Sequence, residues 1–212
     1  NVDWQKMVYT GSGFLQHQYL GISGGSDRFR VMGSLGYQDQ LGQVPGYRAK
    51  RYSFRVNTEM KVTGNRQVRL NVTGSHSPNS TPAGGTGTYG VISEVIRQPP
   101  IFPALLSDGR FGVGWSGTNP LARVRDGGFD DKTYEGFTGT LQVNYQPIKG
   151  MDLEFNYSPQ FGDTLEKSFF KAVSTYDPGS TTPAYTFPAK STLTEGDSRS
   201  WHNTMHFLLH YN

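Results

Sequence analysis

Hydrophobic and polar residues alternate along several stretches of this chain. Between residues 29 and 37 every second position is apolar except Gly33, and the residues between them are mostly small or polar. The stretch 51–62 repeats the alternation, with Thr58 the only lapse on its apolar side and no apolar residue on its polar side. A period of two is typical of a strand with one apolar and one hydrated face, whereas a helix needs apolar spacings of three and four. The pattern therefore predicts strands.

The whole chain contains seven stretches of this kind. The predicted strands are 16–23, 28–39, 50–62, 66–76, 134–146, 151–158 and 201–211. Three connections are tight turns, at 24–27, 63–65 and 147–150. Three are longer, at 40–49, 77–132 and 159–199, and one helix-like patch at 89–97 lies in the longest. Because consecutive antiparallel strands place alternate connections at opposite ends, every tight turn falls at one end of the predicted sheet and every longer loop at the other.

This arrangement is typical of an outer-membrane β-barrel, with short periplasmic turns and long outer loops. A water-soluble β-sandwich shares the alternation, since its apolar face is simply the core. Loops of roughly forty and sixty residues are uncommon in a compact sandwich, which favours the barrel. Aromatic residues near the strand ends also fit the girdles of a barrel. These are Tyr37, Tyr52, Tyr145, Tyr157, Trp201 and Tyr211.

Composition narrows the function classes. The 212 residues, enough for one large all-β domain or two small ones, include 27 Gly and no Cys, which excludes a disulfide scaffold and a Cys-based zinc site. The net charge of +3 comes without a block of Lys or Arg, so a nucleic-acid partner is not expected. The mean hydropathy of −0.55 does not argue against a membrane, because only half of the residues in a spanning strand face lipid.

Several short segments form a recognisable combination when taken in order. They are DWQ at 3–5, YLGISGGSD at 19–27, SLGYQDQ at 34–40, KRYS at 50–53, RVN at 55–57, PP at 99–100, DG at 108–109, NPLA at 119–122 and LLHYN at 208–212. This combination resembles the SusC family of TonB-dependent outer-membrane transporters.

The resemblance implies an all-β fold, in which residues 1–212 are about seven antiparallel meander strands of a larger, 22-stranded transmembrane β-barrel with long extracellular loops. It also implies a plug domain and a TonB-contacting segment, both expected to lie outside this chain. The function implied is import of glycan or peptide nutrients across the outer membrane. The implied partners are TonB, reached through the missing N-terminal part, a SusD-like surface lipoprotein, an oligosaccharide or peptide ligand, and outer-membrane lipid. The alternative function is a secreted β-sandwich module for carbohydrate binding or adhesion.

Two sets of residues are candidates for binding. Aromatic rings in the longest loop offer flat apolar faces to a sugar or to a lid protein, unless they pack the loop on itself. They are Tyr89, Phe102, Phe111 and Trp115. Charged residues on the polar side of the predicted strands are expected to line a hydrated lumen. They are Arg30, Arg51, Arg55, Glu59, Arg69, Asp152 and Glu154.

Other motifs give weaker signals. Residues 85–90 fit G-x-G-x-x-G, but no strand precedes them, so a flexible outer loop is the expectation. His202, His206 and His210 share one side of a strand about 13 Å apart, too far for one metal ion. An acidic group in the longest loop, Asp126, Asp130 and Asp131, does not have the calcium spacing of an EF-hand. Without a G-x-S-x-G motif or a similar nucleophile, we expect no enzyme, no catalytic residue, no metal and no cofactor.

Overall fold

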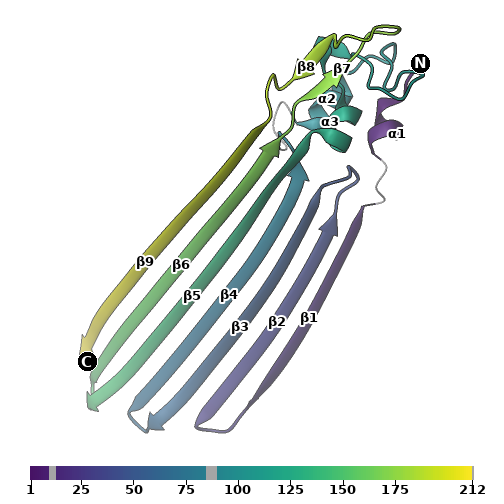
Figure 1. Ribbon diagram of the computed structural model, residues 1–212. Coiled ribbons are helices and arrows are strands. Elements are labelled where there is room, and N and C mark those ends of the chain that lie inside the picture. Colours follow the sequence, from purple (N-terminus) through teal and green to yellow (C-terminus); the bar gives the residue numbers. More distant parts are fainter. Residues whose placement is uncertain (10–12, 85–89, 212) are drawn as a thin grey trace.

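The computed structural model describes residues 1–9, 13–84 and 90–211. Seven long strands form one antiparallel sheet in the order β1-β2-β3-β4-β5-β6-β9, and the helices gather at one end of it (Figure 1). The long strands are β1 (Phe14–Gly25), β2 (Phe29–Leu41), β3 (Arg48–Thr63), β4 (Arg66–Pro82), β5 (Gly128–Ile148), β6 (Met151–Phe170) and β9 (Thr192–Tyr211). The seven-strand meander predicted from the alternation is confirmed.

The strands are longer than predicted at the end that carries the helices. β5 begins at Gly128 and not near 134, while β6 continues to Phe170 and not to 158. The added residues include charges on the otherwise apolar side, Asp131 in β5 and Asp163 and Lys167 in β6, so the hydrophobic alternation lapses there. They pair through the backbone and through cross-strand charges, such as Lys132 with Glu166 at 3.1 Å. The two long interruptions shrink accordingly, to 83–127 and 171–191.

The strand register gathers the apolar residues on one face of the sheet. Leu35 lies opposite Phe54, and Phe155 lies opposite Phe207. These side chains are exposed, with Leu35 at 58% and Phe207 at 67%. Apart from the seven-stranded sheet, the part of the chain that the structure describes holds only the two-stranded β7–β8 sheet, which lies among the helices (Figure 1). No second sheet covers the apolar face, so the β-sandwich alternative is wrong.

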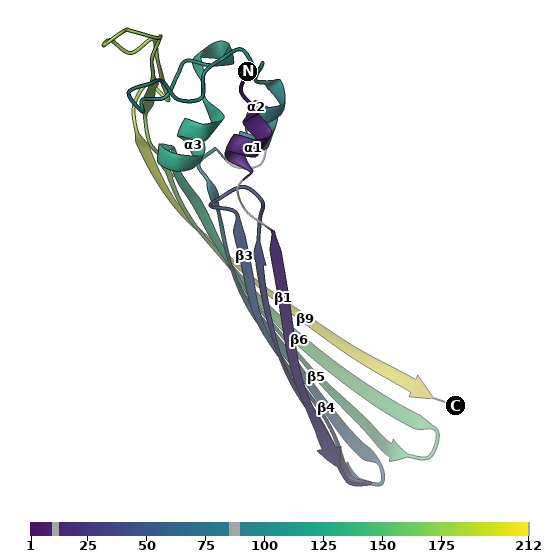
Figure 2. The same cartoon turned by 90° about the vertical axis from the view of Figure 1, so that its right-hand side faces the viewer.

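The buried core lies instead in a small head at the outer end of the sheet (Figure 2). Its elements are α1 (Trp4–Val8), α2 (Val91–Arg97), η1 (Trp115–Gly117), α3 (Pro120–Asp126), β7 (Val173–Thr175) and β8 (Tyr185–Phe187). Trp4, Val8, Val91 and Leu121 are each at most 4% exposed and pack together. No described helix has the length and apolar character needed to cross a membrane.

The sequence missed α1 because five residues are too few to display a helical period. Asp3 begins this helix, since its side chain accepts a hydrogen bond from the backbone N–H of Lys6 at 3.0 Å. The Trp4 ring then buries itself in the head and donates its indole N–H to the carbonyl of Pro99 at 3.1 Å. Residues 1–9 are thereby attached to the longest loop. The helix-like patch predicted at 89–97 corresponds to α2.

Candidate functional site

The polar face of the sheet carries all seven predicted charged residues. Alternation along β3 places Arg51, Arg55 and Glu59 on the side opposite Phe54. The register extends that face to neighbouring strands, since Arg30 and Arg69 both pair with Glu59. Asp152 and Glu154 lie on the same face of β6, where their β9 partners are His210 and Leu208. That this face lines a lumen stays a prediction.

Charges on this face are paired toward the turn end of the sheet. The Glu59 carboxylate accepts a hydrogen bond from the Gln67 amide at 2.5 Å and lies 3.9 Å from the Arg69 guanidinium. Glu154 accepts a hydrogen bond from Asn156 at 2.6 Å. Farther up, Arg51 and Arg55 are exposed and have neither an ion pair nor a side-chain hydrogen bond within the described residues. The upper part of the polar face therefore holds uncompensated positive charge.

A row of small residues crosses the sheet at the level between these two arginines. It is Gly36, Ser53, Ser75, Gly136, Gly162 and Ser200, each the register partner of the next. A Cβ atom on Gly36 would lie 2.7 Å from the Ser53 Oγ atom, and one on Gly162 would lie 2.8 Å from the Ser200 Oγ atom. The serine hydroxyls thus lie over the glycines, and the wall is thin here. The result is a hollow of about 730 Å³.

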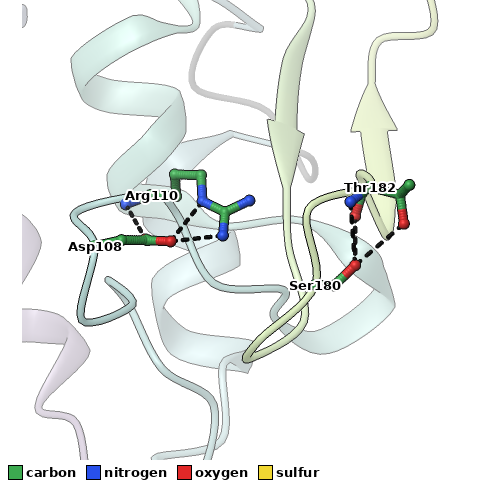
Figure 3. A network of polar contacts seen from close by, with 4 residues as sticks. All are labelled: Asp108, Arg110, Ser180 and Thr182. Carbon is green, nitrogen blue, oxygen red and sulfur yellow. Dashed lines mark hydrogen bonds and ion pairs between the residues drawn. The ribbon is translucent and has the colours of Figure 1, made fainter.

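The two outer loops join each other in the head. Val113 donates its backbone N–H to the Tyr176 carbonyl, and Tyr176 donates to the Phe111 carbonyl, both at 2.9 Å. Beside this junction, Asp108 accepts two hydrogen bonds from Arg110 (Figure 3). The Arg110 guanidinium lies 4.5 Å from the centre of the Tyr176 ring. Those hydrogen bonds hold the pKa of the Asp108 carboxyl below its usual value.

Figure 3 also shows a local turn in the second loop. The Ser180 hydroxyl accepts a hydrogen bond from the Thr182 backbone N–H at 3.2 Å and contacts the Thr182 hydroxyl at 3.1 Å. The turn fixes the tip of the loop by local contacts of the kind that Ser and Thr favour. Each loop therefore has local polar contacts of its own, at 108–110 and at 180–182.

A buried ion pair joins α2 to α3. The Arg123 guanidinium donates to the Glu94 carboxylate and, through Nε, to the Ala83 carbonyl at 3.0 Å. Both side chains are largely buried, at 7% and 14% exposure. Burial raises the pKa of Glu94, because the loss of hydration outweighs the attraction and the hydrogen bond of Arg123. Sequence reasoning missed this pair, since its members are 29 positions apart.

Asn119 organises the same region. Its side-chain oxygen accepts from the backbone N–H groups of Leu121 and Ala122, which begins α3. Its side-chain nitrogen donates to the carbonyls of Ala104 and Gly112, both at 2.9 Å. An Asn before a Pro at the first helical position is a recognisable helix start, so the sequence did carry a signal for this residue.

The four loop aromatics do not form one cluster. Phe102 and Phe111 are partly buried and pack against the core of the head. Trp115 is 56% exposed, and its ring meets Phe102 edge-on with 6.5 Å between centroids. Tyr89 lies outside the described residues. Packing of the loop on itself thus accounts for two of the four, while ligand or lid contact stays a prediction.

Aromatic residues mark the upper border of the apolar face. The rings of Tyr37 and Tyr52 lie 5.2 Å apart, and the Tyr52 ring lies 6.0 Å from that of His76. The His76 ring nitrogen lies 3.0 Å from the Glu135 carboxylate. On the same row Arg199 contacts Asp163 at 3.3 Å. The upper border of the apolar face is therefore a row of aromatic rings and paired charged residues.

The metal and nucleotide motifs do not form sites in the described residues. His202, His206 and His210 lie along one face of β9 and pair across to Gln160, Asn156 and Asp152. Asp126 ends α3, while Asp130 and Asp131 are adjacent in β5 and point to opposite faces. No group of three or more His, Asp or Glu there could hold a metal ion. Most of the G-x-G-x-x-G motif, 85–89, lies outside the described residues.

Comparison with known proteins places this geometry in a family. No family model matches the sequence. The TonB-dependent receptor P3 of Formosa agariphila is 30% identical over 165 residues, which are 74% of this chain and 16% of that protein. The TonB-dependent receptor P26 of the same organism is 23% identical over 180 residues, which are 82% of this chain and 17% of that protein. The chain thus spans about a sixth of the length of these relatives.

Solved structures agree on the fold. Two structures of the RagAB peptide transporter, one of them in the closed-closed state, match 96% of this chain and 23% of theirs at 19% identity. Their TM-scores are 0.63 and 0.58. An antiparallel meander with an uncovered apolar face and a charged opposite face is the wall of an outer-membrane barrel. The chain therefore belongs to the TonB-dependent receptors of the outer membrane, as its resemblance to the SusC family predicted, and forms part of their β-barrel.

Proposed function

We propose that the complete protein imports glycan or peptide nutrients across the outer membrane, and that this chain supplies part of the barrel wall. The proposal rests on the difference in polarity between the two faces of the sheet. One face exposes large apolar side chains such as Leu35 and Phe207, and the other carries charged residues such as Arg51 and Glu59. In a barrel, the first face contacts acyl chains and the second lines a hydrated lumen.

The proposed mechanism assigns a task to each part of the chain. The outer loops, joined through Tyr176 and the core of the head, form part of the mouth where a SusD-like lipoprotein closes over the ligand. TonB then rearranges the plug, and the ligand passes along the polar face. The fold of the RagAB peptide importer supports this assignment.

Cysteine labelling tests the orientation of the wall. The chain contains no Cys, so single substitutions at neighbouring positions report the two faces directly. In outer membranes that carry the complete protein, a water-soluble maleimide should label Thr138→Cys and leave Phe137→Cys unlabelled until the protein is denatured. Equal labelling of both variants in the native membrane would refute the proposed orientation.

Uptake experiments test the activity itself. Cells that carry the complete protein with its lipoprotein should accumulate labelled oligosaccharides or peptides only while TonB is energised. Cells in which TonB is inactivated are the matched control. Accumulation that persists unchanged without TonB would contradict the proposed import mechanism.

A further inference from the structure

The hollow on the polar face has a charge that the proposed function does not explain. We define this cationic hollow by Arg51, Arg55 and His202 together with the small row at its floor. None of the residues that line it, all within the described part of the chain, is Asp or Glu. Toward the turn end Glu59 lies beside Arg69, so neutralisation is available elsewhere on the face. At the hollow, no carboxylate among the lining residues neutralises the two arginines.

The two arginines are placed to act together. They are four residues apart on one face of β3, so their Cα atoms are separated by about 13 Å along the strand. Ser53 lies between them and its small side chain leaves both guanidinium groups open to the hollow. A guanidinium group offers planar donors that match carboxylate and sulfate oxygens. Two such groups at this spacing suit a ligand with repeated anionic groups.

The remaining polar side chains of the lining can hydrogen-bond a sugar, and the apolar members of the lining are Met32, Phe54, Phe137 and Phe161. The hydroxyl and amide groups that line the hollow come from Ser34, Thr73, Ser75, Thr138, Gln160 and Ser200. These side chains can hydrogen-bond a polyhydroxylated ligand along its length. Tyr19 adds an aromatic ring at one end of the small row, because it pairs with Gly36.

We propose that the cationic hollow binds an acidic oligosaccharide, whose carboxylate or sulfate groups pair with Arg51 and Arg55 while its hydroxyl groups bond the surrounding serines and threonines. The proposal rests on the proposed import function and narrows its substrate class. Anionic groups would supply the charge that the wall lacks, and a wall thinned by Gly36, Gly136 and Gly162 leaves room for a sugar chain beside it.

A glycan array read with the purified complete protein tests this proposal. The array carries neutral, carboxylated and sulfated oligosaccharides of matched length. The native protein should bind anionic members selectively, and Arg51→Gln combined with Arg55→Gln should weaken that binding at least about tenfold, since charged hydrogen bonds contribute about that much each. Arg28→Gln is the control, because it removes an arginine at the β1–β2 turn, away from the hollow.

Each other outcome has a distinct meaning. Selective binding of neutral sugars, or anionic binding that survives the double variant, would overturn the cationic hollow as the site. An acidic side chain of the plug could instead occupy the hollow; the double variant would then lower the melting temperature without changing the array pattern, which would also overturn the proposal. An array with no binding at all, together with TonB-driven uptake of peptides, would reject glycan import and leave the peptide form of the proposed function standing.

Discussion

Asn119 offers the sharpest test of how the head is held together. This side chain is 3% exposed and makes four hydrogen bonds, two as an acceptor at the start of α3 and two as a donor to the carbonyls of Ala104 and Gly112. Asn119→Ala removes all four. The Ala104 carbonyl keeps a second donor, the Gly112 backbone N–H at 3.3 Å, so only the Gly112 carbonyl is left without one. Loss of the helix cap costs about 1 kcal/mol and the orphaned carbonyl about 1–3 kcal/mol, so we expect a net loss of about 2–4 kcal/mol.

Two further variants separate the acceptor and donor roles. Asn119→Ser keeps a cap acceptor but has no donor that reaches both carbonyls, so its loss should be smaller than that of the Ala variant. Asn119→Asp keeps both cap acceptors but places an anionic oxygen against two carbonyl oxygens. It should therefore be at least as disruptive as Ala, although Asp is a good helix cap.

Hydrogen exchange measured by mass spectrometry is the appropriate assay, because the head can open while the barrel stays folded. In the complete protein, peptides covering 115–127 should exchange roughly thirty-fold to several-hundred-fold faster in Asn119→Ala, the ratio that 2–4 kcal/mol implies. Gln5→Ala, an exposed change in α1, is the control and should leave exchange unchanged. If Asn119→Asp exchanges like the native protein, the carbonyl bonds are not what holds the head.

Three other predictions follow from the structure. Burial raises the pKa of Glu94 in the folded state above its ordinary 4.5, so the stability that this carboxyl contributes is present at low pH and is lost as the pH rises through the raised value. Hydrogen exchange in the head should therefore become faster over that pH range, and Glu94→Gln should make the exchange rate less dependent on pH. Gly128→Ala should reduce the yield of folded barrel on a heat-shift gel, since Gly128 has a φ of +98° and an added Cβ would meet the Phe169 carbonyl oxygen at 1.9 Å; a normal yield would contradict this. The chain expressed alone should self-associate in light scattering without detergent, because β1 and β9 each have one unpaired edge within the described sheet, and a monodisperse soluble monomer would count against that reasoning.

The strands were predictable where the two faces of the sheet differ in polarity. In β3 the alternation of Tyr52, Phe54 and Val56 with charged residues identified the strand and both faces. The outer extensions of β5 and β6 were not predictable, because charged residues such as Asp163 and Lys167 interrupt the apolar side there. A hydrophobic period identifies a strand only where one side stays apolar over several positions.

The candidate site was predictable as a face but not as a hollow. Alternation alone placed Arg51 and Arg55 on the polar side. That Gly36, Ser53 and Ser75 fall on one row depends on the register of three strands, which the sequence does not fix by itself. The absence of a carboxylate near the arginines likewise depends on which residues of distant strands become neighbours.

The two parts of this chain obtain their stability from different sources, and that difference bears on function. The head buries Trp4 and Val91 among its own side chains. The sheet leaves Phe207 and Leu209 67% and 54% exposed, so its backbone pairing must be supplemented by the acyl chains that cover this face. Because only the apolar face is stabilised by the acyl chains, the polar face does not have to form a buried core. Residues such as Arg51 can therefore keep uncompensated charge for a ligand, and substituting them should change binding without changing assembly of the barrel.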